Sequence, residues 1–233
     1  MLDEVTTPTP TTSQVLIAVK YAALNPFDWK IALGYVRDQM SLPLPYTLGV
    51  DFVGTIVAHG EHASCFKVGD RVMTMSNRLG AFAEHIAVEE SILAHVPPTM
   101  SDEIAATIPI PGLLAWQALY AAGEIGSGMR ILIPGASGVV GSIAIQLAKA
   151  QGACVIGTAS AKNRQYVMDL GADEFIDYKA QSFDELVEDI DLVLDFVLVG
   201  GDKSMSSMQD TQNTKLISIC TRWLQRLLLQ CDS

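Results

Sequence analysis

Cysteines and basic residues are both scarce in this chain. The 233 residues include four cysteines, and no two of them form a C-x-x-C pair. This spacing excludes a disulfide framework and a zinc knuckle, and it fits a reducing compartment such as the cytoplasm. Lysine and arginine total 15 against 26 aspartates and glutamates, which gives a net charge of −11. Such an acidic chain argues against nucleic acid or an anionic membrane as a partner.

Long apolar runs are missing as well. No stretch of the sequence reaches membrane-spanning length without glycine, proline or charge. The first residues, Met1 to Glu4, are acidic and precede threonines and prolines, unlike a secretory signal peptide. We therefore expect a cytoplasmic chain with no membrane partner. A hydrophobic share of 49% is enough to build the core of one large domain or two small ones.

Residues 130–164 are the most informative segment. An apolar run at 131–133 precedes a turn of small residues, a helical pattern follows, and a second apolar run stands at 154–157. This order is typical of a nucleotide-binding strand, turn and helix unit. Small residues let backbone N–H groups approach a diphosphate, and the helix N-terminus favours its charge. A purely structural tight turn is the alternative. The residues predicted to hold the diphosphate are Gly135, Ala136, Ser137, Gly138, Val139, Val140 and Gly141.

The end of the second apolar run distinguishes between the nicotinamide dinucleotides. An acidic residue about 20 positions after the glycines would bind the ribose 2′-hydroxyl of NAD. Residues 158–164, TASAKNR, contain no carboxylate but carry hydroxyls and two cations. We predict NADP(H), with Thr158 in the cofactor site and Ser160 and Lys162 as the main contacts of the 2′-phosphate. The alternative is that Lys162 and Arg164 only solvate the start of a helix.

The sequence pattern changes from mainly strands to strands and helices near residue 101. Before it we expect strands at 15–19, 48–57, 71–73 and 81–88, a helical turn at 27–33 and an extended stretch at 42–45, which together indicate a compact, barrel-like β-domain. Ser101 would begin a helix, and Pro109 and Pro111 would kink or break the helical material that follows. Further along we expect helices at 165–170 and 183–188 and strands at 173–178, 191–197 and 215–220.

Five motifs lie along the chain in a fixed order: AALNPFDWK (22–30), PLPYTLGVDFVG (43–54), FKVGDRV (66–72), GAFAEHIAV (80–88) and IPGASGVVGSIAIQLAKAQGA (133–153). Together they resemble the zinc-free branch of the medium-chain dehydrogenase/reductase superfamily, which contains quinone oxidoreductases and trans-acting enoyl reductases. The resemblance implies an α/β fold, in which a GroES-like β-barrel catalytic domain (1–108) precedes an incomplete Rossmann domain (109–220) with a doubly wound parallel sheet. It also implies an active site in the cleft between the two.

The resemblance also bears on metal binding. Zinc-dependent relatives take ligands from a cysteine after the first strand and from the histidine of a Gly-His-Glu triplet. The aligned positions here are Asn25 and Val50-Asp51, and the four-cysteine structural lobe of those relatives is missing. The segment His59-x-x-His62-x-x-Cys65 has metal-like spacing but falls where the family has a surface turn. We therefore expect no metal site.

Without a metal, hydrogen bonds must polarise the carbonyl of the substrate while NADPH delivers hydride. By resemblance, Asn25 and Tyr46 face the nicotinamide, Tyr46 donates its hydroxyl to the substrate oxygen, and Lys30 adds positive charge nearby. Each has a structural alternative: Asn25 caps a turn before Pro26, Tyr46 is a packing residue, and Lys30 is solvated.

The resemblance assigns three more residues to the cofactor site. Tyr178 would lie beside the adenosine phosphate, with core packing as the alternative, and Phe196 and Val197 would line the nicotinamide pocket. Leu114 departs from the family, which usually has a threonine there whose hydroxyl helps hold the nicotinamide.

Both ends of the chain also depart from the family. We expect the opening strands of the catalytic domain and the sixth Rossmann strand to be missing. The tail at 221–233 has apolar residues at 223, 224, 227 and 228 on one helical face. That face would cover the exposed edge of the sheet, serve a homo-oligomer or another partner, or have no evolved role.

These observations predict an NADPH-dependent, zinc-independent oxidoreductase that transfers hydride to a quinone or an α,β-unsaturated carbonyl. The alternative is a truncated, non-catalytic remnant that binds NADP(H) or a partner. Short-chain dehydrogenases are disfavoured because no Tyr-x-x-x-Lys pair occurs and about 130 residues precede the glycine turn. An alcohol dehydrogenase is disfavoured because the metal that would lower the pKa of the alcohol has no ligands.

Overall fold

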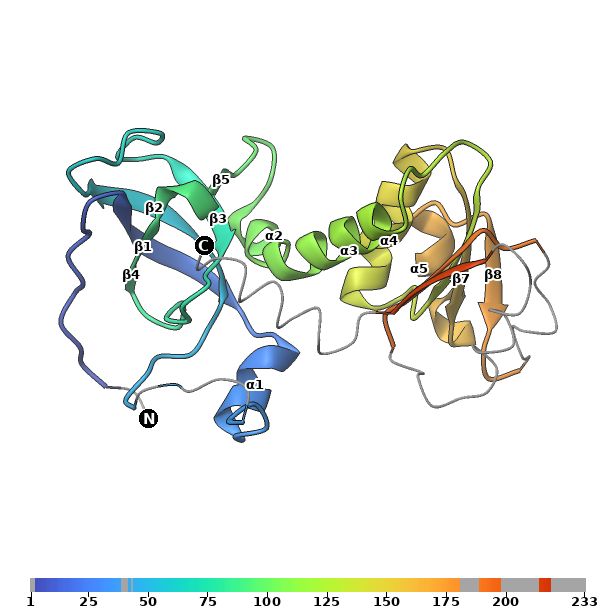
Figure 1. Cartoon of the computed structure of the whole chain (residues 1–233), viewed down its shortest axis with the longest axis horizontal. Helices are drawn as coiled ribbons and strands as arrows, with labels where there is room; N and C mark the ends of the chain where they lie inside the picture. Colours follow the sequence, from blue (N-terminus) through green and yellow to red (C-terminus); the bar gives the residue numbers. More distant parts are fainter. Residues whose placement is uncertain (1–2, 39–41, 43, 181–188, 198–213, 219–233) are drawn as a thin grey trace. The chain divides into compact units, whose positions relative to one another are not determined.

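The computed structural model describes residues 3–38, 42, 44–180, 189–197 and 214–218. The chain divides into two compact units, Met1–Ile110 and Pro111–Ser233 (Figure 1). The helix expected at 183–188 and the tail at 221–233 lie outside the described residues. No helix in the part of the chain that the structure describes is both long and apolar enough to cross a bilayer.

Unit 1 (Met1–Ile110) is built on an antiparallel sheet. In β3 and β4 every second residue is buried, which is the pattern of a strand with one face on the core. The inward-facing side chains, among them Val15, Ile17, Phe52 and Ile56, form one apolar cluster. Within the described residues the sheet has the order β4-β1-β2-β3-β5, with β1 (Gln14–Ala23), β2 (Asp51–His59), β3 (Arg71–Met75), β4 (His85–Glu89) and β5 (Ala94–His95).

Two of the expected strand starts were wrong, and both errors have one cause. The strand expected from residue 48 begins at Asp51, and the strand expected from residue 81 begins at His85. The backbone N–H groups of Ala81 and Phe82 donate instead to the carbonyls of Gly49 and Leu48, at 3.0 and 2.9 Å. The segments around residues 48–49 and 81–82 therefore form backbone hydrogen bonds with each other and lie outside the regular strands.

The helices of unit 1 begin where their capping residues predict. After α1 (Pro26–Ala32) and the 3-10 turn η1 (Glu90–Ile92), helix α2 (Asp102–Ala106) begins with the Ser101 hydroxyl accepting from the N–H of Ile104 at 3.4 Å. Helix α3 (Pro109–Ala121) then starts on a proline, whose missing N–H costs nothing at a helix start. The prolines thus break the helical material in two, as expected.

Asp102 fastens α2 to the sheet. Its Oδ1 accepts from Arg71 Nε at 2.9 Å and its Oδ2 accepts from Lys20 Nζ at 2.5 Å, while its side chain is only 10% exposed. The hydrogen bond from Lys20, followed by that from Arg71, holds the pKa of Asp102 below its ordinary value. A carboxylate whose pKa is lowered by folding stabilises the fold at every pH above its ordinary pKa. This stabilisation is lost as the pH falls through the lowered pKa of the folded protein.

Asp102→Asn is expected to lower the free energy of unfolding of unit 1 by roughly 1.5–3 kcal/mol at neutral pH, because the charge-assisted hydrogen bonds from Lys20 and Arg71 lose their charged acceptor. Urea unfolding followed by far-UV circular dichroism measures the change. The difference from wild type should shrink as the pH falls below about 4 and vanish below the lowered pKa, where the folded wild-type carboxyl is protonated too. Glu103→Gln is the control in the same helical turn, since Glu103 accepts from the Tyr21 hydroxyl on the exposed surface at 2.6 Å. A difference independent of pH would contradict the assigned role of the charge.

Unit 2 (Pro111–Ser233) contains a parallel sheet. Each neighbouring pair of strands runs parallel. The order matches the first five positions of the 3-2-1-4-5-6 Rossmann arrangement, which confirms the expected fold class. Of the described residues, five strands form the sheet in the order β10-β9-β6-β7-β8, with β6 (Arg130–Pro134), β7 (Cys154–Ala159), β8 (Glu174–Asp177), β9 (Leu192–Asp195) and β10 (Lys215–Ser218).

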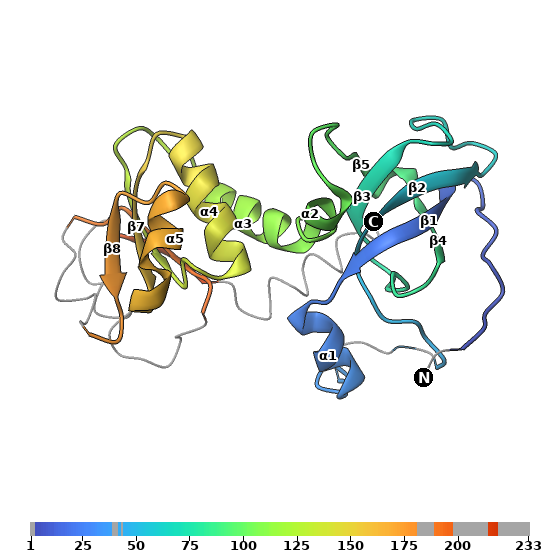
Figure 2. The ribbon, with the colours of Figure 1, turned by 180° about the vertical axis from the view of Figure 1, so that it is seen from behind.

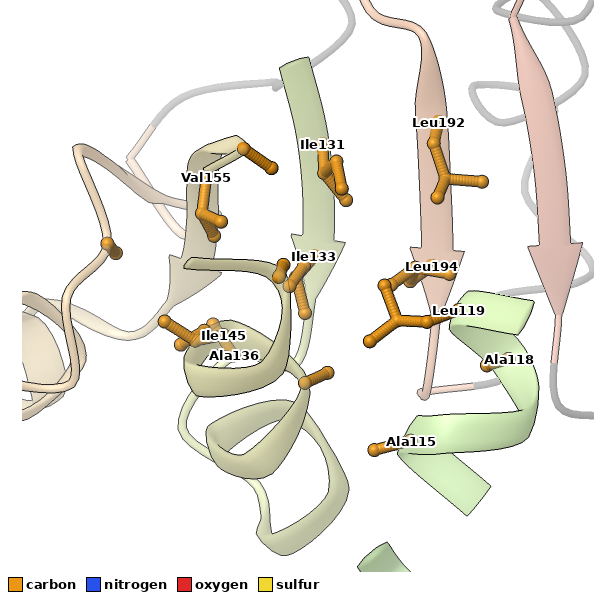
Figure 3. Packing of buried hydrophobic residues seen from close by; sticks show 14 of the residues in the cluster. Ala115, Ala118, Leu119, Ile131, Ile133, Ala136, Ile145, Val155, Leu192 and Leu194 are labelled. Atoms are coloured by element: carbon orange, nitrogen blue, oxygen red, sulfur yellow. The ribbon is translucent and has the colours of Figure 1, made fainter. Parts of the chain in front are cut away.

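Helices cover one face of this sheet. Helix α4 (Val139–Ala150) packs against β6 and β7, and α5 (Arg164–Asp169), which follows the 3-10 turn η2 (Ala161–Asn163), packs against β7 and β8 (Figure 2). Figure 3 shows Leu119 of α3 and Ile145 of α4 on the same side of the sheet as the strand residues Ile133 and Leu194, and all four belong to one buried apolar cluster. Leu132, Ile156 and Val193 are buried on the opposite face. Burial on both faces explains why these strands read as continuous apolar runs.

Candidate functional site

Most of the residues predicted to hold the cofactor follow the carboxyl ends of parallel strands in unit 2, and Thr158 lies within β7. The small-residue turn at 135–141 follows β6, the segment 160–162 follows β7, Tyr178 follows β8, and residues 196–197 follow β9. These four strands are neighbours in the sheet, so their carboxyl ends share one edge. The order reverses between β6 and β9, and a crevice at such a reversal is where open α/β sheets bind ligands.

The turn at 135–141 has the backbone shape that a diphosphate requires. Gly135 has φ +71°, a conformation that residues with a side chain rarely adopt. A Cβ on Gly141 would lie 2.4 Å from the carbonyl oxygen of Gly135 and 2.9 Å from Cα of Ala136, so only glycine fits. Gly138 caps α4, whose first N–H groups have no partner within the helix and point out of its N-terminus. The turn therefore fits an anionic diphosphate.

Ala136 occupies the position of the motif's first glycine without disturbing the turn. Its side chain is fully buried, and its N–H donates to the carbonyl of Thr158 on β7 at 3.0 Å. Opposite it stands Gly157, where an added Cβ would lie 3.0 Å from the Ala136 methyl and 2.6 Å from Val167. The methyl of Ala136 thus uses space that the glycine on β7 leaves open.

A hydrogen bond not expected from the sequence joins the turn to the segment after β7. Asn163 Nδ2 donates to Ser137 Oγ at 2.9 Å. A hydroxyl that accepts this bond still has its own proton to donate, so Ser137 can donate to a phosphate oxygen. Asn163 lies inside the TASAKNR segment, between two cations, but no pattern in the sequence indicates its partner.

The segment after β7 exposes positive charge and no carboxylate. Thr158 is buried, so its contribution is the carbonyl bonded to Ala136, whereas Ser160 is half-buried and caps η2, and Lys162 is exposed. The Arg164 guanidinium lies 5.3 Å from the ring centroid of Phe175. This stacking draws Arg164 toward β8, which leaves Lys162 as the more available cation.

The residues after β8 and β9 are also placed at this edge. Tyr178 is 53% exposed, which removes core packing as the reason for its presence. Val197 packs against the turn after β6, because a Cβ on Gly135 would lie 2.3 Å from its Cγ2. The nearby Asp177 accepts from the N–H of Lys179 at 3.0 Å and belongs to β8, so it does not replace the acidic residue missing after β7.

The candidate reaction residues lie in unit 1, and one of them belongs to a buried polar cluster. Asn25 is the N-cap of α1 and forms a capping box with Asp28, whose Oδ2 accepts from the N–H of Asn25 at 2.7 Å. Asn25 Nδ2 donates to Asp51 Oδ2 at 3.1 Å. Asp51 also accepts from the N–H of Ile110 at 3.1 and 3.2 Å. Asn25 therefore does cap a turn, and it is also held by a buried carboxylate.

Asp51 was missed as a functional candidate. It is fully buried, and burial is the main cause that raises its pKa to about 7, against the lowering effect of the bonds from Ile110 and Asn25. The sequence did contain a signal, since Asp51 is the one carboxylate in the apolar run LGVDFVGTIV. A single charge inside a buried strand needs partners or a function.

Lys30 and Tyr46 are half-buried, and among the described residues no hydrogen bond joins either of them to Asn25. Lys30 Nζ lies 5.8 Å from the ring centroid of Trp29. The described part of the chain contains no group of three His, Cys, Asp or Glu side chains placed to hold a metal ion, and this includes the His59 to Cys65 segment.

An antiparallel β-unit followed by a parallel sheet with a glycine turn after its first strand is typical of the fold of nucleotide-dependent dehydrogenases and reductases. Two family models match the chain: the alcohol dehydrogenase GroES-like domain at residues 11–98 and the zinc-binding dehydrogenase domain at residues 139–209. The crystal structure of an alcohol dehydrogenase superfamily protein from Novosphingobium aromaticivorans is 30% identical, with a TM-score of 0.83 over 99% of this chain and 77% of that one. The chain belongs to the medium-chain dehydrogenase/reductase family.

Two relatives with named activities are similar to most of this chain. A chloroplastic quinone-oxidoreductase homolog of Spinacia oleracea is 37% identical over 204 residues, which are 84% of this chain and 62% of the spinach protein. The structure of the CurK enoyl reductase has a TM-score of 0.83 at 26% identity and covers 97% of this chain and 73% of that one. The chain spans between 54% and 62% of the length of four curated relatives that it matches.

Proposed function

We propose that this protein is an NADPH-dependent reductase that transfers hydride to a quinone or an α,β-unsaturated carbonyl without a catalytic zinc. The observation that carries the proposal is the edge of the parallel sheet in unit 2, where a glycine turn lies beside a cationic segment with no carboxylate. The spinach relative is named for quinones and CurK for enoyl substrates, which supports this pair of substrate classes.

The residues of unit 2 would bind and orient the cofactor. The N–H groups of the turn and the Ser137 hydroxyl would bind the diphosphate, and Lys162 with Ser160 would bind the 2′-phosphate. Tyr178 would lie beside the adenosine, and Phe196 and Val197 would line the nicotinamide pocket. When bound, NADPH supplies the hydride.

In unit 1, Tyr46 would donate its hydroxyl to the substrate oxygen, and Lys30 would add positive charge near it. Both would stabilise negative charge that develops on the oxygen during reduction. Asn25 would face the nicotinamide. Zinc independence is supported by Asn25 and Val50, since neither offers the thiolate or imidazole that zinc-dependent relatives use.

A second candidate function is NADP(H) binding without turnover. Leu114 supports it, because this buried residue stands where the family usually has a threonine hydroxyl for the nicotinamide. A cofactor held only by its phosphates would bind well and react slowly. The expected cytoplasmic location, and association with a second copy or a partner, stay predictions in both cases.

Purified protein is expected to oxidise NADPH only when a quinone or enone is added, and to use NADPH in preference to NADH. Absorbance at about 340 nm follows turnover across a panel of small quinones and enones, and calorimetry measures the binding of each cofactor separately. Pretreatment with EDTA should leave turnover unchanged.

Each alternative gives its own outcome in this assay. Saturable NADPH binding with no turnover on any acceptor would favour the second candidate. Loss of turnover after EDTA, restored by zinc, would contradict the metal-free reaction. Absence of binding to either cofactor would contradict both candidates.

A further inference from the structure

The Asp51 carboxylate joins three segments of unit 1 at one point. It begins β2, it accepts two contacts from the N–H of Ile110 in the first turn of α3, and it accepts one from Asn25 at the start of α1. Both carboxylate oxygens therefore face N–H donors. Because the side chain is fully buried, water cannot replace a contact that is lost.

We propose that Asp51 is a positioning residue for the reaction: its negative charge holds the Asn25 amide and the first turn of α3 in the arrangement that turnover requires. This inference rests on the proposed reductase function, in which Asn25 faces the nicotinamide. Protonation of Asp51 would remove its negative charge and turn one of the two acceptor oxygens into an O–H donor, which weakens the hydrogen bonds from Asn25 and Ile110. The neutral acid would therefore hold these two groups less firmly.

Burial and a neighbouring carboxyl set the pH at which this change occurs. Burial, with a smaller contribution from the nearby Asp28 carboxyl, raises the pKa of Asp51 to about 7, although the hydrogen bonds from Ile110 and Asn25 act to lower it. The residues paired with Asp51 on the adjacent strands are Ala23 on β1 and Met75 on β3, and neither can ionise. The charge that the proposal requires is thus gained within the physiological pH range.

Asp51→Asn is the decisive variant, because it keeps the size of the side chain and removes the charge. At saturating NADPH and quinone, we expect wild-type kcat to fall about tenfold per pH unit below an apparent pKa near 7. In Asp51→Asn this acid limb should be absent, and kcat should stay roughly tenfold or more below the wild-type plateau at all pH values. NADPH affinity should change by less than about twofold, because the diphosphate turn lies in unit 2.

Asp102→Asn is the matched control. Asp102 is also a buried carboxylate of unit 1, but it pairs with Lys20 and Arg71, and its pKa is lowered. This variant should lose stability and keep the acid limb of wild type. Asp51→Glu, which retains the charge, should restore part of the plateau. An acid limb that persists in Asp51→Asn would overturn the inference and leave Asp51 with a structural role only.

A second readout does not depend on turnover. The side-chain amide signals of Asn25, assigned by their loss in Asn25→Ser, should shift with a midpoint near pH 7 in wild type and stay constant in Asp51→Asn. Failure of wild type to reduce any acceptor would contradict the proposed function, while these signals would still report whether Asp51 controls Asn25. Signals that do not change with pH in wild type would refute the coupling.

Discussion

Lys162→Glu is expected to weaken NADPH binding by roughly a hundredfold or more and to leave NADH binding within about threefold of wild type. A charge-assisted hydrogen bond to the 2′-phosphate contributes about 1.5–3 kcal/mol, and the new carboxylate would also repel the phosphate. Each 1.4 kcal/mol corresponds to about tenfold in affinity. Calorimetric titration of the two cofactors at the same ionic strength measures the ratio.

Two further variants separate Lys162 from its neighbour. Lys162→Gln removes the charge without reversing it and should give an intermediate loss for NADPH. Arg164→Gln should give a smaller loss, because the guanidinium lies against Phe175. An equal loss for NADPH and NADH in Lys162→Glu would refute the 2′-phosphate assignment. The NADPH affinity of wild type should also fall more steeply with salt than its NADH affinity.

Gly141→Ala is expected to abolish saturable NADPH binding at practical concentrations. The added Cβ would lie 2.4 Å from one backbone atom of the turn and 2.9 Å from another, and backbone cannot move aside as the end of a side chain can. Overpacking of this kind costs about 1–3 kcal/mol of stability, so unit 2 should also unfold at lower denaturant. Calorimetry with NADPH and urea unfolding measure the two effects.

Gly126→Ala is the control for this substitution. Gly126 lies in the same unit, and an added Cβ there would meet no atom within 4 Å. This variant should bind NADPH like wild type and unfold at a similar urea concentration. Normal NADPH binding by Gly141→Ala would show that the turn is not where the diphosphate binds.

Local sequence patterns were sufficient for most of the fold. The unit from β6 to β7 was predictable because an apolar run, a turn of small residues and an amphipathic helix each carry their own signal. The break between α2 and α3 was predictable because Pro109 cannot continue a preceding helix. The starts of β2 and β4 were not, since they depend on hydrogen bonds between Leu48 or Gly49 and residues far along the chain.

The same distinction separates the candidate site residues that the sequence indicates from those that only the structure brings to notice. The glycine turn and Lys162 follow strands at fixed spacings, so a linear pattern locates them. Asp51 acts through partners 26 and 59 positions away, and Asn163 through a partner 26 positions away. No periodicity encodes such distances, and only the folded sheet brings these groups together. Their sequence signal is limited to residue type.

In the turn of unit 2, the side chain present at Ala136 and the side chain absent at Gly157 are complementary. The methyl of Ala136 and the bare α-carbon of Gly157 share a single volume between β6 and β7, with Val167 closing its far side. Substitutions at the two positions are therefore interdependent: glycine at 136 would leave a void, and a Cβ at 157 could use that space only if Val167, 2.6 Å from it, also moved. A substitution at one of the two positions alone would produce either a cavity or a steric clash.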